Sequence, residues 1–234
     1  MKGQKNICMG IAGLLLCASS AMAQSQPTAR LTPDEERWLA GTWPVLLYAR
    51  DEGLPLDVVV QPQPSPGLPP IALAYIDGRC KFVFSMRGNP EVQATLSRIA
   101  PELLDATLEL MAAHELGHCR RHVGGAWHAL PDGHAQTRST AMNAQAEQED
   151  RQAVRREEAY ADLVGLAWTY QHHRPLYARL HAWLVAERTL LQDPGGAHDT
   201  LAWARLATQG ERWAGPAIFE TANALWVRGL DAAR

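Results

Sequence analysis

The chain has 234 residues, and its 25 acidic and 22 basic side chains give a formal net charge of −3 at pH 7. This balance excludes a strongly basic nucleic-acid-binding protein, because binding to phosphates requires a clear excess of Lys and Arg. The length suits one domain with a sizeable core, and beyond residue 23 no apolar run is long enough to cross a bilayer.

The first 23 residues have the pattern of a secretory signal peptide. A head with two lysines precedes an apolar run over residues 7–18, and Ala21-Met22-Ala23 matches a small-x-small cleavage site. We expect cleavage before Gln24, which leaves 211 residues (234 minus 23) with a net charge of −5 (−3 minus 2). The mature chain, residues 24–234, is then expected to be one periplasmic or secreted domain without a membrane span. The alternative is an uncleaved N-terminal anchor.

Two of the four cysteines belong to the signal peptide, which leaves Cys80 and Cys119. An even pair in an exported protein favours a Cys80–Cys119 disulfide. The alternative is two buried thiols, since spacing along the sequence does not show that the Cα atoms lie within bonding reach.

A helix is predicted to begin after residue 32. Thr32 can cap it, Pro33 stands at the first helical position, and Glu35 completes a capping box. Pro44 should end or kink this helix, because proline lacks the backbone N–H and its ring clashes with the preceding turn.

A small antiparallel sheet of two or three strands is predicted to follow. Residues 56–61 (LDVVVQ) are strand-like, whereas the five prolines in residues 61–70 indicate an extended loop. IALAYI (71–76) and CKFVFSM (80–86) flank Asp77-Gly78, which is typical of a two-residue hairpin turn.

From residue 89 onward the sequence is predicted to be mostly helical. Helices are expected over residues 90–99, 101–123 and 152–170, with two or three more in the C-terminal part, 175–234. The polar residues 124–150 are predicted to form a surface excursion or lid. The order of one helix, a small sheet and then many helices indicates a predominantly helical α+β fold.

The pentapeptide HELGH, residues 114–118, lies inside the second of these helices. Residues four apart on a helix share a face, so His114 and His118 can direct two imidazoles at one Zn²⁺ ion. Glu115 lies beside them and could take a proton from a water next to the metal. The structural alternative is a helix whose histidines only satisfy polar groups.

A third metal ligand has to come from another element. His122 is unsuitable, because ligands at 114, 118 and 122 would spread along about 12 Å of one straight helix. The arrangement HExxHxxGxxH is absent too, since Arg121 and Gly124 occupy the positions of its glycine and its third histidine.

The better candidate lies in RREEAYADLVG, residues 155–165. Glu158 and Asp162 share a helix face, and Gly165 further along would allow another helix to approach closely. Glu158 can bind the metal, and Asp162 can accept a hydrogen bond from the far nitrogen of a ligand histidine. The alternatives are a solvated acidic turn, or Glu157 as a substitute ligand.

HELGH followed by a Glu-x-x-x-Asp helix resembles the gluzincin metallopeptidases, which include the thermolysin family and the prenyl-protease-like family of membrane and periplasmic enzymes. The resemblance covers residues 114–118 and 158–162 and implies a zincin-like core. It also implies that Glu115 is the general base and that Asp162 orients a ligand histidine. The residues that match the zinc ligands are His114, His118 and Glu158.

A weaker match is HRPLYAR, which begins at His173 and looks like the HPPLxxR stretch of prenyl-protease-like members. By this resemblance His173 or Arg179 could stabilise the tetrahedral oxyanion. The alternative is that Pro175 simply opens a new helix. Tyr160 and Tyr177 are other possible oxyanion donors.

In gluzincin-like folds an edge strand beside the zinc helix pairs with extended substrate. The resemblance nominates CKFVFSM, residues 80–86, as that strand. A Cys80–Cys119 bridge would fasten it to the residue after His118.

These observations predict an exported zinc metallopeptidase that hydrolyses peptide bonds in a peptide or protein substrate. The alternative is a non-catalytic, zinc-stabilised helical binding module, closed by a fourth ligand from Cys119, His122 or a loop histidine. A zinc hydrolase that acts on another kind of bond is a third possibility.

Overall fold

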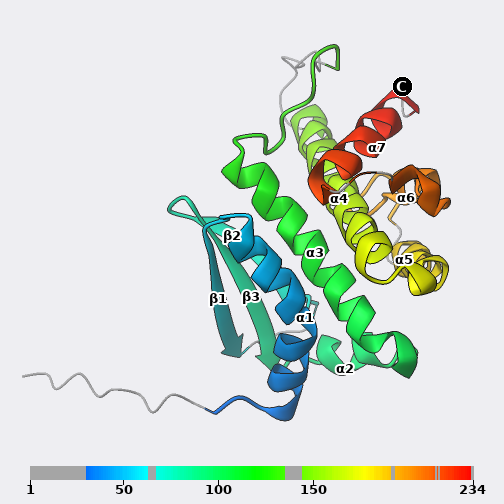
Figure 1. Ribbon diagram of the computed structural model, residues 1–234. Helices are drawn as coiled ribbons and strands as arrows, with labels where there is room; N and C mark the ends of the chain where they lie inside the picture. The colour runs from blue at the N-terminus through cyan, green and yellow to red at the C-terminus, as the bar shows by residue number, and fades with distance from the viewer. Residues whose placement is uncertain are drawn as a thin grey trace, which may run out of the picture. The chain divides into compact units, whose positions relative to one another are not determined.

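Seven α-helices and one three-stranded sheet make up the computed structural model, which describes residues 30–62, 67–134, 144–190, 193–213, 215 and 217–232. The predicted, predominantly helical α+β class is confirmed (Figure 1). The predicted signal peptide lies outside the described residues. Within them, no helix has the length and apolar character needed to cross a membrane.

In chain order the elements are α1 (Pro33–Asp51), β1 (Leu56–Pro62), β2 (Ile71–Ile76), β3 (Arg79–Arg87), α2 (Glu91–Leu96), η1 (Pro101–Leu103), α3 (Leu104–Val123), α4 (Ala144–His172), η2 (Arg174–Leu176), α5 (Tyr177–Leu190), α6 (Leu201–Leu206), η3 (Gly210–Trp213) and α7 (Ile218–Ala232).

Helix α1 begins with the predicted capping box. The Glu35 amide donates to the Thr32 hydroxyl at 3.2 Å, and the Thr32 amide donates to the Glu35 carboxylate at 2.7 Å. The helix does not end at Pro44 but continues to Asp51. Val45 and Ala49 lie beyond the proline and are buried in the core, so their packing offsets the backbone hydrogen bond that proline cannot make.

The sheet has the order β1-β3-β2 and is mixed, so the prediction of an all-antiparallel sheet is wrong. Strands β2 and β3 pair antiparallel across Asp77-Gly78, whose positive φ angles of 51° and 76° suit the predicted hairpin turn. Strand β1 pairs with β3 in parallel. In the sheet, one strand position lies between β1 and β2, and β3 fills it.

Strand β3 is therefore central, and the nomination of residues 80–86 as the edge strand is wrong. Its backbone pairs with β1 on one side and with β2 on the other, so it cannot accept a further strand. The strand beside α3 with a free edge is β2.

Helix α3 lies between α1 with the sheet on one side and α4 on the other (Figure 1). Helix α4 in turn packs against α5, α6 and α7. It begins at Ala144, so residues 144–150 belong to this helix and not to the predicted surface excursion. Alanine, glutamate and glutamine favour helix in this stretch. Residues 135–143 of the predicted excursion lie outside the described residues.

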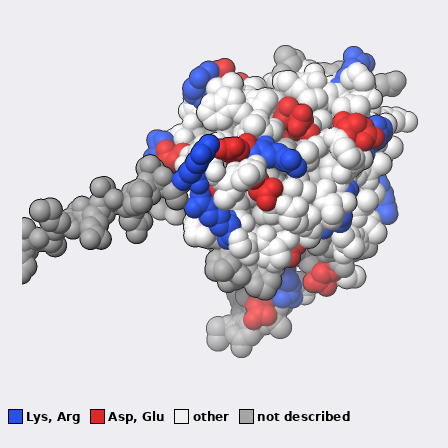
Figure 2. All heavy atoms as spheres, turned by 90° about the horizontal axis from the view of Figure 1, so that it is seen from below, with Lys and Arg blue, Asp and Glu red and all other residues white. Residues whose placement is uncertain are grey.

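Charged side chains on the face drawn in Figure 2 are of both signs and are interspersed with uncharged ones. This mixture agrees with the near balance of 22 basic and 25 acidic residues in the whole chain.

Two glycines let α3 and α4 approach each other closely. A Cβ atom on Gly165 would lie 2.9 Å from the Leu110 carbonyl oxygen, and one on Gly117 would lie 3.0 Å from the Ala161 Cα atom. Such distances leave no room for a methyl group unless a backbone moves. The expectation that Gly165 allows close helix approach is confirmed, and the approach brings the Glu158 face of α4 to α3.

Gly165→Ala is predicted to destabilise the protein by about 1–3 kcal/mol, because the new methyl group overpacks the seam between α3 and α4. Urea unfolding followed by circular dichroism measures the change. In an unobstructed helix the same substitution stabilises by up to about 1 kcal/mol. A stabilised Gly165→Ala variant would therefore contradict the close contact.

Candidate metal centre

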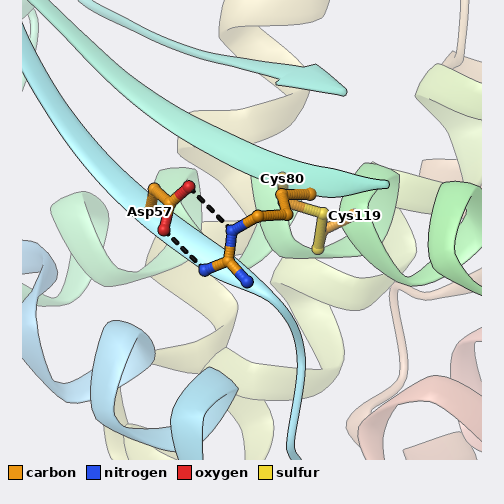
Figure 3. The surroundings of a disulfide bond; sticks show 4 residues. Asp57, Cys80 and Cys119 are labelled. Carbon is orange, nitrogen blue, oxygen red and sulfur yellow. Dashed lines mark hydrogen bonds and ion pairs between the residues drawn. A yellow bond between two sulfur atoms is a disulfide. The ribbon is translucent and has the colours of Figure 1, made fainter. Parts of the chain in front are cut away.

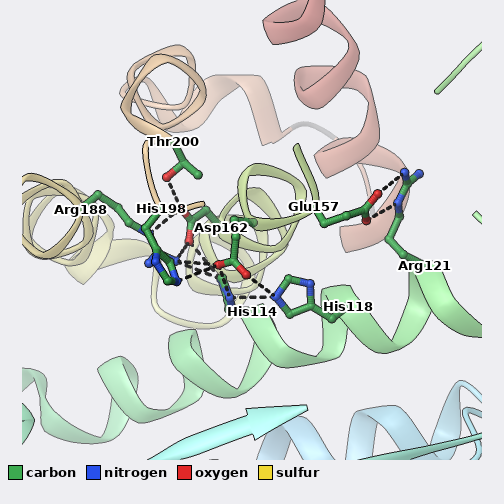
Figure 4. Close-up of polar contacts among 9 residues, drawn as sticks. His114, His118, Arg121, Glu157, Asp162, Arg188, His198 and Thr200 are labelled. Carbon is green, nitrogen blue, oxygen red and sulfur yellow. Dashed lines mark hydrogen bonds and ion pairs between the residues drawn. The ribbon is translucent and has the colours of Figure 1, made fainter. Parts of the chain in front are cut away.

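Three side chains from α3 and α4 direct potential ligand atoms at one point. His114 Nε2 and His118 Nε2 lie 3.1 Å apart. The two Glu158 oxygens lie 3.4 Å from these nitrogens, one from each. Figure 4 shows the two imidazoles projecting from α3 toward α4. This brings together the three metal ligands predicted from the sequence.

The donor set and its spacing fit Zn²⁺. Zinc–nitrogen bonds of about 2.0–2.1 Å in a tetrahedral site place neighbouring ligand atoms about 3.3 Å apart. The observed separations of 3.1 and 3.4 Å match this value. Two imidazoles and one carboxylate are also the ligand types that catalytic zinc sites use, with a fourth position left for water.

Asp162 orients the first histidine. Its carboxylate is fully buried and lies 3.0 Å from His114 Nδ1. Asp162 can accept a hydrogen bond there only if Nδ1 carries a proton, so in the neutral imidazole it is Nε2 that is left to bind a metal. This is the role that the spacing predicted.

Arg188 and Thr200, which the sequence patterns did not identify, complete the surroundings of Asp162. Arg188 of α5 donates to both Asp162 oxygens, at 2.8 and 2.5 Å, and the Thr200 hydroxyl donates at 2.6 Å. Figure 4 shows these groups around the carboxylate. The buried negative charge is therefore paired and fully hydrogen-bonded, as a buried carboxylate requires.

Both acids stay ionised. Burial raises the Glu158 pKa, but hydrogen bonds from His114 and His118 outweigh it and hold the pKa well below its usual range. Burial likewise raises the Asp162 pKa, and the nearby Arg188 charge outweighs it and lowers the pKa. For His114, burial lowers the pKa, but hydrogen bonds to the two carboxylates raise it to about 10. Two ionised carboxylates therefore flank His114, and a metal ion bound at its Nε2 would replace the proton that this pKa implies.

Glu115 follows His114 on α3 and lines the same cavity as the three ligand residues. Burial raises the pKa of its carboxyl group, and the nearby His114 and His118 oppose that shift. A carboxylate with a raised pKa is a better proton acceptor at neutral pH. Its place and its environment suit the predicted general base.

The cavity beside the cluster has a volume of about 730 Å³ and lies between β2, α2, α3, α4 and α5. Its lining includes the start of β2, Trp127, Trp183 and His198. His198 Nε2 lies 3.5 Å from a Glu158 oxygen, and the side chain is 48% exposed. Sequence inspection missed His198, because it has no ligand spacing to the other histidines.

His173 and Arg179, the two residues singled out in the HRPLYAR match, do not line this cavity. His173 Nε2 contacts the Glu109 carboxylate at 2.9 Å, and Arg179 pairs with Glu102 at 2.5 Å. The prediction of an oxyanion role for His173 or Arg179 is therefore not supported. Pro175 opens a new helical segment, as the alternative reading stated.

The two tyrosines proposed as oxyanion donors also point elsewhere. The Tyr177 hydroxyl donates to the Ala207 carbonyl and accepts from Trp213. The Tyr160 ring is buried against Trp226.

Glu157, the alternative ligand, is occupied by other groups. Its carboxylate forms a buried, two-point ion pair with Arg121, at 2.9 and 2.8 Å, and accepts from the His128 amide at 2.9 Å. Figure 4 shows this pair on the far side of His118 from Asp162. Only Glu158 of the two neighbouring acids reaches the histidines.

Cys80 and Cys119 form the predicted disulfide, with their Cα atoms 5.7 Å apart (Figure 3). Both residues are fully buried. The bond joins β3 to the residue after His118, so Cys119 is not available as a metal ligand. Disulfides are typical of oxidising compartments, which agrees with an extracytoplasmic location.

No protein-family model, no curated protein and no solved structure matches this chain. The function is therefore inferred from the geometry of the site alone.

We predict that the purified mature chain binds about one zinc ion, and that His114→Ala or Glu158→Ala lowers the content below about a tenth of an ion, because two remaining ligands hold zinc weakly. Mass spectrometry of dialysed protein measures the content. His122→Ala is the matched control, one turn along the same helix, and it should keep its zinc. Equal zinc in all four proteins would contradict the assigned ligands.

We also predict that reduction of Cys80–Cys119 lowers any activity of the site before it unfolds the chain, because the bond fixes α3 directly after His118. A titration with reductant, read by activity and by circular dichroism, tests this order. Loss of activity and of fold at the same reductant concentration would count against a separate effect on the site.

Proposed function

We propose that this chain is an exported zinc metallopeptidase of gluzincin type, which hydrolyses peptide bonds. The observation that carries the proposal is the convergence of His114 Nε2, His118 Nε2 and Glu158 at the spacing of zinc ligands, beside a cavity. The disulfide and the predicted signal peptide support export to the periplasm or beyond the cell.

His114, His118 and Glu158 would hold the zinc ion, and Asp162 would keep His114 in the tautomer that binds. When bound, the ion supplies a Lewis acid that acidifies water and polarises a carbonyl group. Three protein ligands would leave a coordination position for solvent or substrate, and all three residues line the cavity.

Glu115 then carries the proton. Its carboxylate accepts a proton from the attacking water and later delivers it to the leaving amine nitrogen. The raised pKa of Glu115 favours both transfers near neutral pH. Metal binding and proton transfer need carboxyl groups with different pKa values. The lowered pKa of Glu158 keeps it ionised for the metal, whereas the raised pKa of Glu115 lets it take up and release a proton.

The substrate would bind along β2. The start of this strand lines the cavity, and its outer edge is free for main-chain hydrogen bonds to an extended peptide. His198, whose Nε2 lies 3.5 Å from a Glu158 oxygen and which lines the cavity, would donate a hydrogen bond to the oxygen of the attacked carbonyl.

The alternative remains a non-catalytic, zinc-stabilised binding module. His198 is the histidine that could close such a site, since it lies beside Glu158. A zinc site closed by a fourth protein ligand does not need Glu115 as a base, so a substitution of this residue distinguishes the two functions.

Glu115→Gln is predicted to lower the turnover number for a fluorogenic casein or peptide substrate by at least about 100-fold, since a general base contributes about 10²–10⁴-fold. Zinc content and thermal unfolding should not change. Glu91→Gln, which alters an acid of α2 in the same cavity, is the control and should keep activity. Active Glu115→Gln protein, or no turnover by zinc-loaded wild type, would overturn the proposed function.

A further inference from the structure

The segment after α3 turns back over the cavity. Past Val123 the chain reverses through Gly124 and Gly125, the latter with φ 65°, and the Ala126 amide donates to the Arg121 carbonyl at 2.8 Å. This reversal places the Trp127 side chain in the lining of the cavity, beside the metal cluster.

A buried ion pair fixes this turn. Glu157 is 1% exposed and Arg121 7% exposed, and they hold each other at two points. Arg121 also donates to the Ala129 carbonyl at 2.7 Å, and the His128 amide donates to Glu157. His128 has φ 61°, which a residue other than glycine seldom adopts without such support. The turn that carries Trp127 is therefore a built part of the site.

The rings of Tyr75, His122 and Trp127 form what we call the aromatic wall, and Trp127 also stacks on the His128 ring, with centroids 5.0 Å apart. The Tyr75 and His122 ring centroids lie 4.8 Å apart, and those of His122 and Trp127 lie 3.8 Å apart, with planes within 14°. The wall links β2 to the end of α3. Trp127 also meets the His118 ring edge to face at 5.6 Å.

The wall is uncharged and lies a short distance from the reacting centre. Burial lowers the pKa of His122, so its ring is neutral at pH 7. His122 is one helical turn beyond His118, or about 6 Å along the axis. An extended peptide rises about 3.3 Å per residue, so the wall faces a side chain within about two residues of the scissile bond.

The α2 and α5 side of the cavity has a different character. There Arg98 and Glu187 form an ion pair at 2.8 Å, and both line the cavity. A peptide in the cavity would therefore meet a charged pair, Arg98 just after α2 and Glu187 on α5, and flat uncharged rings beyond His118. This difference gives the cavity a means to select among side chains.

We propose that the aromatic wall is a specificity subsite, which binds an aromatic or large apolar side chain of the substrate through Trp127. The proposal rests on the proposed peptidase function and names the substrate class: peptides with such a residue within two positions of the cleaved bond. Ring-to-ring and ring-to-methyl contacts against Trp127 provide the selectivity.

The test uses zinc-loaded mature protein carrying Glu115→Gln, so that binding is measured without turnover. The probes are fluorescein-labelled octapeptides of Ala, Gly and Ser in which a single Phe is moved along the sequence, with a Phe-free peptide as reference. Fluorescence anisotropy should show that Phe at one or two positions tightens binding at least tenfold. Adding Trp127→Ala should abolish that preference, and adding Trp127→Phe should keep most of it.

Trp183→Ala is the matched control, because Trp183 lines the same cavity from α5 and is not part of the wall. It should leave the Phe preference intact. Zinc content and circular dichroism of each variant show that the site and the fold persist.

An unchanged Phe preference in the Trp127→Ala background would overturn the subsite, while turnover by the wild type would still uphold the peptidase. Equal binding of all the peptides to the parent protein would overturn the subsite in the same way. Absence of any peptide binding, together with no turnover by the wild type, would overturn both proposals.

Discussion

The close approach of α3 and α4 is the constraint on which the rest of the structure depends. The histidines stand on one helix and Glu158 on the other, so the 3.4 Å separations between Glu158 and each histidine exist only if the helices nearly touch. Gly117 and Gly165 make this possible, because each lies where a side chain would meet the neighbouring helix. The candidate metal centre is in this sense a product of helix packing.

Buried charge imposes a second condition on the same pair of helices. Asp162 beside His114 would be costly in the core without a cation, and Arg188 of α5 supplies one. Thr200, just before α6, takes a further lone pair. The C-terminal helices thus contribute to the site as well as covering α4, since they complete the groups that hold a ligand histidine in one orientation.

Local patterns predicted much of this arrangement, because they depend on neighbours in the chain. The capping box at Thr32, the Asp77-Gly78 turn and the faces of α3 and α4 follow from spacing alone. The position of β3 between β1 and β2 depends on how the chain crosses over, which no local pattern encodes. Arg188 and His198 reach the site through the packing of α5 and of the loop before α6, which no local pattern encodes. Packing also directs His173 and Arg179 to Glu109 and Glu102, so the oxyanion role expected from HRPLYAR is not supported.

The disulfide has a consequence for the durability of the protein when proteases are present. It links two residues 39 positions apart, and the stretch between them contains β3, α2 and both ligand histidines. A single nick in the backbone anywhere between the two cysteines would leave both fragments covalently tethered. The histidine pair would then stay attached to the sheet, and the damaged chain would keep its candidate ligands in one molecule.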